Sequence, residues 1–533
     1  MLGLSIRGLA GNPTPETFNT TQWKTNGPFE LSPERGRYAL TYALTEYHSV
    51  SFPTALAKFA APDVGYINGS YVSLFAPTVS LIAIPGYIIG KYFGAAQVGA
   101  FAVSAFFALL NVYLIRLIAI RLGAHPLAGT IGAVTFLFAS PAFTYAVTLY
   151  QHHISTFLIL SSLYLLIRFS SFWSFALIWL LFAFSLTVDY PNLFLMLPIA
   201  VGAFFKVFIV TRLGEVRKVS ISLTRVFAMI GMGVPLLFFL WFNQLSYGSP
   251  FQLSGAVDRV TSVKADGSPL LERDVLIAQM KKEHVQFVDE GKSSFLGFFL
   301  PRNMIEGFAT HLINPDRGML YFTPVLFLGA FGAVILLRRK NQYVALLLGI
   351  IGFDLLLYSM WGDPYGGWAF GSRYLIPAYS ILAIFISVLL TRVHKSNLVL
   401  LLFFVLFSYS VGVNTLGAIT SSANPPKIEA QGLAAKSGIP QEYTYIRNVY
   451  LLNAGQVKSF AYESKLHDFL SPWQYYISLT FLLIFVTGLL LAYYRMLSNE
   501  SMQEEIYVRK AEHPVLGVKH YGRRVQVPQG GKV

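Results

Sequence analysis

The chain has 533 residues, a net charge of +14 and a mean hydropathy of +0.55, and only 12% of its residues are charged. A soluble domain carries about 25% charged residues, so the composition excludes an ordinary soluble protein and indicates a multi-pass membrane protein. The positive charge does not point to nucleic acid, because most Lys and Arg directly follow apolar runs, as in the cytoplasmic loops of membrane proteins. The absence of Cys excludes disulfides and Cys-ligated metals.

Apolar runs, most of them near the roughly 20 residues of a membrane span, follow one another along the chain. We predict helices at 72–92, 98–121, 126–148, 152–169, 171–188, 191–210, 224–246, 318–337, 343–360, 374–391, 397–419 and 473–494. The first run contains Pro77, Pro85 and Gly86, so we favour an external juxtamembrane or re-entrant helix there over a span. The predicted fold class is an all-α, polytopic membrane protein of about 11–12 transmembrane helices with external juxtamembrane helices and loops.

The basic residues predict which side of the membrane each loop occupies. Clusters at 212–225, 338–340 and 392–395 belong in the cytoplasm. The loops that then face outward are 149–152, 188–191, 247–317, 361–373 and 420–472. The predicted parts are an external first loop with juxtamembrane helices at 1–97, a transmembrane domain at 98–494 with external loops 247–317 and 420–472, and a basic cytoplasmic tail at 495–533. We expect a plasma-membrane protein with an outward-facing site.

Nearly every unusual polar motif lies in these external segments. The motifs are "SPERGRYALTYALTEYHSVSFP", "APDVGYINGSYVSLFAPT", "YQHH", "TVDYPN", "INPDRGMLYFTP" and "WGDPYGGWAFGSRYLIP". The span interiors are almost free of charge, and the clear exception, Asp354, is expected to make an intramembrane hydrogen bond. Ion-coupled transporters keep ionisable groups near the bilayer midplane. The pattern therefore favours chemistry at the membrane surface, on a substrate with a lipid tail and a polar head.

The residue types suggest what that chemistry is. Carboxylates next to Arg and His, without Cys or a metal-spaced His cluster, fit proton abstraction from an acceptor hydroxyl. Arg is well shaped to bind and stabilise a departing phosphate, and aromatic side chains with flexible Gly can cover a sugar ring. The candidate substrate-binding residues are Arg37, Tyr71, His152, His153, Asp189, Arg317, Trp361, Asp363, Trp368 and Arg373.

Taken together, the motifs resemble GT-C-type membrane glycosyltransferases, and most of all those called dolichyl-phosphate-mannose–protein mannosyltransferase-like. The stretches that carry the resemblance cover most of residues 30–390. They are "ERGRYALTYALTEYHS", "DVGYINGSYVSLFAPTVSLIAIPGY", "NQLSYGSPF", "NPDRGMLYFTPVL" and "YGGWAFGSRYLIP". The resemblance implies an inverting hexosyl or pentosyl transfer from a polyprenyl-phosphate (dolichyl-phosphate-type) donor to a lipid, glycan or protein acceptor, beside membrane lipids and without nucleic acid.

The resemblance also implies roles for individual residues. The acid before the Arg-Tyr motif, usually Asp in the family, is Glu34 here and would deprotonate the acceptor; Asp63 is the second candidate catalytic acid. Arg373 is favoured over Arg317 as the phosphate ligand, because its loop is short and lies between two spans. Gly366 and its glycine neighbours would allow close backbone approach. No cofactor is assigned, and a divalent cation is left open.

Each assignment has a plainer alternative. Glu34 could be a helix-start acid favoured by the helix dipole, Asp189 a helix N-cap, and the two His residues a helix end at the interface. The Trp residues and Arg373 could form an interfacial aromatic belt with a snorkelling Arg. For the whole protein, the alternative function is a flippase or transporter of lipid-linked glycans.

Overall fold

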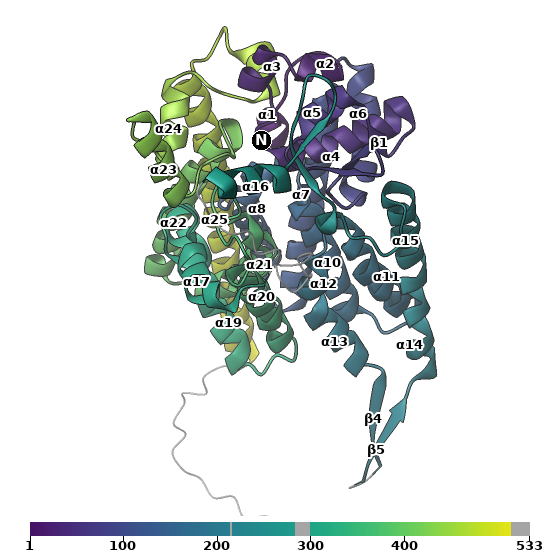
Figure 1. Cartoon of the computed structure of the whole chain (residues 1–533). Helices are drawn as coiled ribbons and strands as arrows, with labels where there is room; N and C mark the ends of the chain where they lie inside the picture. The colour runs from purple at the N-terminus through teal and green to yellow at the C-terminus, as the bar shows by residue number, and fades with distance from the viewer. Residues whose placement is uncertain (214–215, 283–298, 513–533) are drawn as a thin grey trace, which may run out of the picture.

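The computed structural model describes residues 1–213, 216–282 and 299–512, and the side chains within these ranges except those of 210–213, 216–218 and 498–512. A bundle of helices carries, at one end, a layer of short helices and a small sheet (Figure 1). The predicted tail beyond residue 512 and part of the predicted external loop, 283–298, lie outside the described residues. The prediction of a mainly helical polytopic membrane protein is confirmed.

Five helical stretches in the described chain are long and apolar enough to cross a membrane. They are Ala96–Arg121, Leu223–Tyr247, Arg373–Val393, Asn397–Ile419 and Pro472–Leu497. The bundle helices containing these stretches are α7 (Ala96–Arg121), α14 (Leu223–Phe227), α15 (Gly233–Tyr247), α21 (Ile376–Val393), α22 (Asn397–Ile419) and α25 (Pro472–Glu512). Shorter bundle helices are α8 (Pro126–Phe138), α10 (His152–Arg168), α11 (Phe172–Val188), α13 (Leu197–Phe205), α19 (Gly329–Arg338) and α20 (Val344–Ser359).

Several predicted runs are interrupted in the structure. The run 126–148 breaks after α8 and resumes as the short α9 (Ala142–Ala146), and the break contains Pro141. The run 191–210 becomes α12 (Asn192–Leu195) and α13, and it ends in a hairpin of β4 (Phe208–Leu213) and β5 (Val216–Ile221). The run 318–337 divides into α18 (Met319–Phe322), a 3-10 turn at Pro324–Leu328, and α19.

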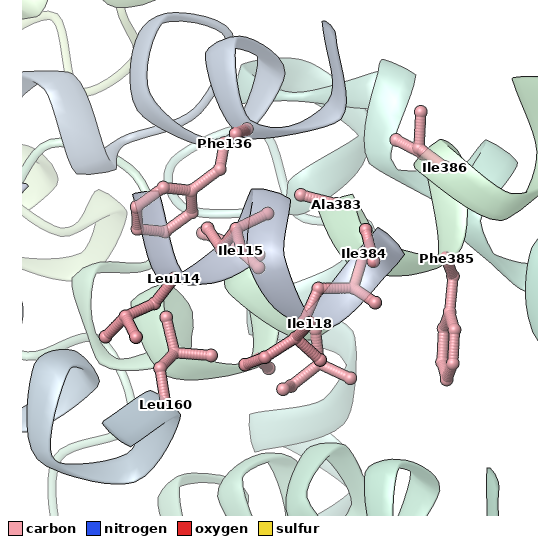
Figure 2. Close-up of a cluster of buried hydrophobic side chains, with 14 of the residues drawn as sticks. Leu114, Ile115, Ile118, Phe136, Leu160, Ala383, Ile384, Phe385 and Ile386 are labelled. Atoms are coloured by element: carbon pink, nitrogen blue, oxygen red, sulfur yellow. The ribbon is translucent and has the colours of Figure 1, made fainter. Parts of the chain in front are cut away.

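The centre of the bundle is a close-packed apolar cluster (Figure 2). Leu114, Ile115 and Ile118 of α7 lie near Phe136 of α8 and the buried face of α21 at 383–386. Small residues allow the helices to approach, as is usual in membranes; a Cβ on Gly132, for example, would collide with Ser387 of α21. The predicted intramembrane hydrogen bond of Asp354 is confirmed, because its Oδ2 accepts from the backbone N–H of Ala378 at 2.9 Å.

The layer at the end of the bundle is built from the segments predicted to be external. The first loop supplies α1 (Leu2–Ser5), α2 (Pro15–Phe18), α3 (Thr21–Asn26), α4 (Ser32–Tyr42), a π-helix at Ala43–Tyr47, α5 (Thr54–Ala60) and α6 (Thr78–Tyr92). The later loops supply α16 (Glu272–Lys282), α23 (Lys427–Ser437) and α24 (Ile446–Asn453), whereas α17 (Met304–Leu312) lies against α20 of the bundle. The hairpin β4–β5 lies at the opposite end of the molecule (Figure 1).

One sheet joins two distant loops within this layer. Its order is β1-β3-β2-β6-β7, and all its pairs are antiparallel. The first loop contributes β1 (Ser51–Phe52), β2 (Val64–Ile67) and β3 (Ser70–Ser73), while the long loop contributes β6 (Arg259–Val263) and β7 (Pro269–Leu271). Because β3 occupies the start of the predicted run 72–92, only Thr78–Tyr92 of that run is helical.

Candidate functional site

Two arginines from distant parts of the chain meet at one buried tyrosine. Tyr150 lies in the turn between α9 and α10 and is 1% exposed. The guanidinium carbon of Arg373, at the start of the segment leading into α21, lies 5.4 Å from the centre of its ring, and that of Arg37, on α4, lies 5.9 Å from it. Both distances suit a cation–π contact. The site thus concentrates two positive charges around one ring.

Both arginines have buried hydrogen-bond donors without a partner among the described residues. Arg373 donates from Nη2 to the carbonyl of Gly366 at 2.9 Å and also interacts with the Tyr374 hydroxyl, while its buried Nε and Nη1 have no hydrogen-bond partner among the described residues. Arg37 donates from Nη1 to the carbonyl of Pro33 at 3.0 Å, and its buried Nε has no partner among the described residues. A buried donor without a partner costs about 1–3 kcal/mol, so a group of them indicates a place for an acceptor-rich ligand.

Tyr150 and His152 add two more polar atoms of this kind. The Tyr150 hydroxyl and His152 Nε2 are buried and lack a hydrogen-bond partner among the described residues. The two rings lie nearly parallel, with centres 5.8 Å apart. The position therefore offers four donor-capable side chains, those of Arg37, Tyr150, His152 and Arg373, which is the arrangement that phosphate oxygens would satisfy.

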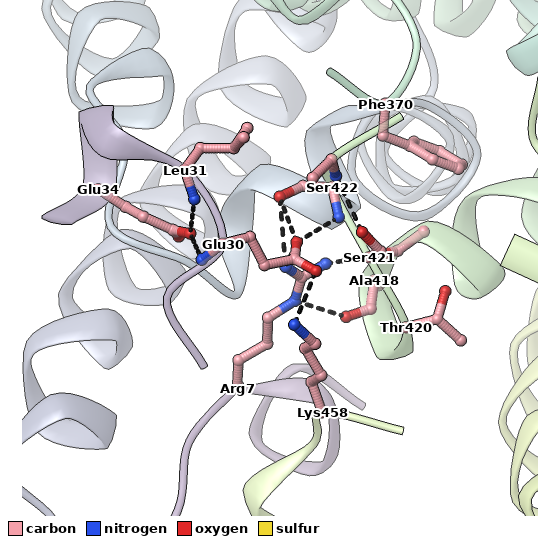
Figure 3. A network of polar contacts seen from close by, with 12 residues as sticks. Arg7, Glu30, Leu31, Glu34, Phe370, Ala418, Thr420, Ser421, Ser422 and Lys458 are labelled. Carbon is pink, nitrogen blue, oxygen red and sulfur yellow. Dashed lines mark hydrogen bonds and ion pairs between the residues drawn. The ribbon is translucent and has the colours of Figure 1, made fainter. Parts of the chain in front are cut away.

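Glu34 lies fully buried in the first turn of α4, and its two carboxyl oxygens have different surroundings (Figure 3). Its Oε1 accepts from the backbone N–H groups of Glu30 and Leu31, the latter at 3.0 Å, which fits the helix-start alternative. Its Oε2 has no partner among the described residues. Burial, and then the charge of Glu30, raise the pKa of Glu34 to about 7 against the opposing effects of Arg7 and the two N–H groups. A carboxyl with this pKa can take up a proton near neutral pH.

The charge of Glu34 acts on the same tyrosine as the arginines. Burial and then the charge of Glu34 raise the pKa of the Tyr150 hydroxyl, while Arg373 and Arg37 act in the opposite direction. Burial also lowers the pKa of Arg37 to about 10 despite the nearby carboxylate of Asp189, so Arg37 remains charged at neutral pH. One carboxyl and two cations therefore surround Tyr150.

Asp189 completes the charge pattern and borders an apolar cavity. It follows the last residue of α11, and its Oδ2 accepts from Gln151 Nε2 at 2.9 Å rather than capping the next helix. Burial raises its pKa, although Arg37, Gln151 and Arg373 lower it. A mainly apolar cavity of about 200 Å³ reaches from Asp189 to Phe75, whose ring centre lies 4.3 Å from the Arg37 guanidinium. A hydrophobic pocket thus adjoins the cationic cluster.

The loop 361–373 is held in shape by its own polar groups. Asp363 accepts from the backbone N–H groups of Tyr365 and Gly367 at 3.1 and 2.5 Å. Gly366 and Gly367 have φ of 73° and 61°, in the left-handed region that favours glycine. The carbonyl of Gly366 then binds Arg373, so the glycine turn orients the arginine.

Arg317 supports this loop from the other side. It is 1% exposed and donates to four carbonyls, those of Tyr365, Gly367, Asn424 and Asp316, at 2.6–2.9 Å. With its donors used in this way, Arg317 is bonded to the backbone and does not join the cluster around Tyr150.

Asp63 is close to the cluster but already paired. Its Oδ2 accepts from the Ser32 hydroxyl at 2.6 Å, and its Oδ1 lies 3.0 Å from Arg259 Nη2. It therefore ties the start of α4 to β6. Glu34, which retains an oxygen without a partner, is geometrically the better candidate for a proton acceptor.

Four other predicted residues lie outside the cluster. Tyr71 donates its hydroxyl to the Gly267 carbonyl within the sheet region. His153 Nε2 lies 2.8 Å from the Ala142 carbonyl inside the bundle. Trp368 contacts Arg447, with 5.7 Å between guanidinium and ring, and Trp361 lines the apolar cavity.

Tyr150 and Gln151 are the residues that sequence reasoning missed. They belong to the "YQHH" motif, which was singled out for its two His residues. The signal that could have found them is an aromatic and an amide residue directly before two His residues at a predicted external turn.

The described residues contain no group of three or more His, Cys, Asp and Glu side chains that could hold a metal ion. The described residues therefore offer no ligand set for the divalent cation that the sequence leaves open. The donor-capable groups at the cluster are those of a site for an anion.

No protein-family model matches the sequence, and no curated protein matches it. Among solved structures, the chain is similar to ArnT from Cupriavidus metallidurans in the apo state, at 14% identity and a TM-score of 0.43, over 92% of this chain and 74% of that chain. It is also similar to ArnT from the same organism bound to undecaprenyl phosphate, at 14% identity and a TM-score of 0.40, over 98% of this chain and 80% of that chain. Likeness at this level says nothing about chemistry, so the site of this chain is defined by its own contacts.

Proposed function

We propose that the protein is a membrane glycosyltransferase that moves a sugar from a polyprenyl-phosphate donor to an acceptor hydroxyl on the extracytoplasmic face of the plasma membrane. The observation that carries the proposal is the set of donors of Arg37, Tyr150 and Arg373 that have no partner among the described residues, together with the buried carboxyl of Glu34, whose charge acts on Tyr150. The adjoining apolar cavity would take the start of the prenyl chain. The bound phosphate would satisfy the donors and balance the two cations.

The transfer follows from these positions. The acceptor hydroxyl attacks the anomeric carbon, its proton passes to Glu34 Oε2, and the bond from the anomeric carbon to the phosphate oxygen breaks. Arg373 and Arg37 stabilise the charge that develops on the departing polyprenyl phosphate. Glu34 afterwards releases the proton to water. Attack opposite the leaving group inverts the anomeric configuration.

The proposal implies a pH dependence. A general base must be deprotonated to act, and the pKa of Glu34 is raised to about 7. The rate of transfer should therefore fall as pH decreases through about 7 and level off above it. The measurement is the initial rate of sugar transfer between pH 5 and 9.

The central test compares Glu34→Gln with the native protein. Labelled sugar is supplied on a panel of polyprenyl-phosphate hexoses and pentoses, with host membranes as the source of lipid, glycan and protein acceptors. We expect transfer to fall by about 10²–10⁴-fold, while polyprenyl phosphate binds nearly as before, because the arginines are unchanged. Glu46→Gln is the matched control, since Glu46 pairs with Lys91 on the neighbouring helix and does not contact the cluster. Near-native transfer by Glu34→Gln would show that Glu34 is not the base.

The transporter alternative predicts a different product. A flippase would move the lipid-linked glycan across vesicles of purified protein without forming a glycosidic bond. Movement without transfer, retained in Glu34→Gln, would replace the proposed enzyme by a transporter.

The outward orientation can be tested with a single introduced thiol, because the chain has no Cys. Gln22 in the layer that contains Glu34, and Ser220 on the hairpin at the opposite end, are both exposed. In intact cells, a membrane-impermeant maleimide should label Gln22→Cys and leave Ser220→Cys unlabelled until the cells are opened. The reverse pattern would place the site in the cytoplasm.

A further inference from the structure

A buried ionic network lies directly behind Glu34 (Figure 3). Arg7, fully buried, contacts Glu30 Oε2 through Nη1 at 2.6 Å and donates from Nη2 to the Gly417 carbonyl at 2.7 Å. Lys458 Nζ lies 2.9 Å from Glu30 Oε1, and the N–H and hydroxyl of Ser422 donate to Oε2 at 2.6 and 2.9 Å. Glu30 thus joins the N-terminal segment to the end of α22 and to the loop before α25.

This network reaches Glu34 through the main chain. The backbone N–H of Glu30 donates to Glu34 Oε1, so the residue whose carboxylate is fixed by Arg7 and Lys458 also holds the proposed base. Burial would raise the pKa of Glu30, but Lys458 and Arg7 outweigh it and hold that pKa well below its usual range. Glu30 is therefore ionised, and its negative charge stands next to Glu34.

The charged and titratable groups around Glu34 come from several elements. They are Glu30 before α4, Arg7 of the N-terminal segment, Arg35 on α4 itself and Tyr150 at the turn before α10. Among these, Glu30 is the negative charge next to Glu34, and Arg7 is a cation that opposes it. The protonation of Glu34 is set by this balance as well as by burial.

We propose that Glu30 is a positioning residue for Glu34. Its carboxylate, held by Arg7 and Lys458, fixes the backbone N–H that orients Glu34. The negative charge of that carboxylate also opposes the ionisation of Glu34, in addition to the effect of burial. This deepens the proposed function, because it rests on Glu34 acting as the base. It also gives the N-terminal segment and the loop around Lys458 a direct influence on the site.

The network predicts shifts of opposite sign. Glu30→Gln keeps the backbone N–H but removes the negative charge and leaves Arg7 and Lys458 uncompensated, so Glu34 should titrate at lower pH. Lys458→Gln removes a cation from Glu30 and leaves the negative charge less balanced, so Glu34 should titrate at higher pH. Each shift should be about one pH unit or more, as expected for charges in close contact. A general loss of packing would not produce this reversal of sign.

The experiment measures the titration of Glu34 directly. Full-length protein with ¹³C-labelled Glu is titrated by infrared or NMR spectroscopy, and the Glu34 signal is identified by its loss in Glu34→Gln. Glu30→Gln, Lys458→Gln and the control Glu46→Gln are then compared, together with the pH profile of sugar transfer. The expected result is a downward shift, an upward shift and no shift of the midpoint, with the acid limb of the transfer rate moving in parallel.

The outcomes separate the two proposals. Midpoints that stay in place, or that move in the same direction in Glu30→Gln and Lys458→Gln, overturn the role of Glu30. Midpoints that move as expected while the pH profile of transfer does not follow retain the network and reject Glu34 as the base. If Glu30→Gln does not fold, Lys458→Gln decides, because Lys458 is partly exposed, at 18% of its side chain, and its failure to raise the midpoint contradicts the proposal.

Discussion

Arg317 contacts the loop 361–373 from outside and Arg373 is its last residue, and their guanidinium groups differ in what they bind. Arg317 donates to four backbone carbonyls, whereas Arg373 donates to one and retains buried donors without a described partner. Arg317 is buried and Arg373 is half-buried, and both lie in motifs of similar composition. The comparison teaches that burial of an arginine does not identify a ligand site; the donors that the protein leaves unused do.

Among the substitutions that test this comparison, the largest effect should come from Arg373. We expect Arg373→Gln to lower kcat/KM for sugar transfer by about 10²–10³-fold, because it removes charge-assisted bonds to the departing phosphate. The loss should appear as weak binding of polyprenyl phosphate to purified protein, with thermal stability nearly unchanged. Arg373→Lys should recover only part of the activity, since Lys keeps the charge without the planar fork.

At Arg317 we expect a large loss of stability and little loss of polyprenyl-phosphate binding. Arg317→Gln leaves several buried carbonyls without a donor and should lower the free energy of unfolding by about 3 kcal/mol. Thermal unfolding in detergent measures this loss. In the fraction that remains folded, polyprenyl phosphate should bind with near-native affinity. If the folded fraction of Arg317→Gln bound polyprenyl phosphate as weakly as Arg373→Gln does, the distinction between the two arginines would be contradicted.

Tyr150 tests whether the ring between the two cations matters. Tyr150→Ala removes cation–π contacts that contribute about 2 kcal/mol in a desolvated site, so polyprenyl phosphate should bind about 30-fold more weakly. Tyr150→Phe keeps the ring and should cost less than about tenfold. Equal losses in the two variants would assign the effect to the hydroxyl instead. Titration of the purified variants with polyprenyl phosphate gives both affinities.

The smallest effect should come from the glycine turn that orients Arg373. Gly366→Ala places a side chain in the left-handed region and should cost about 1–2 kcal/mol of stability, with a modest rise in KM for the donor. Gly352→Ala, in the open face of α20, is the matched control and should be neutral or slightly stabilising. Thermal unfolding and donor KM of both variants check the prediction, and equal effects of the two would contradict it.

The sequence by itself determined the class of protein and identified many of the residues that form the candidate site. Apolar runs form helices in lipid, since each helix satisfies its own backbone hydrogen bonds. The clustering of polar motifs in predicted external loops identified Glu34, Arg37, Asp189 and Arg373 as candidates. The breaks in the runs at 126–148 and 191–210, and the sheet that joins two loops, were not predicted, because Pro-containing apolar runs and short strands have no clear periodic signal.

Only the tertiary structure decided which of the candidate residues lie together. Arg317 and Arg373 cannot be separated by sequence, because what separates them is the presence of carbonyls from distant segments such as Asn424 around one of them. The same holds for Glu30, which looks like an ordinary surface acid until Arg7 of the N-terminal segment and Lys458 of the loop before α25 are brought to it. Hydrogen-bond saturation and buried charge balance depend on neighbours far apart in the chain, and the fold alone supplies those neighbours.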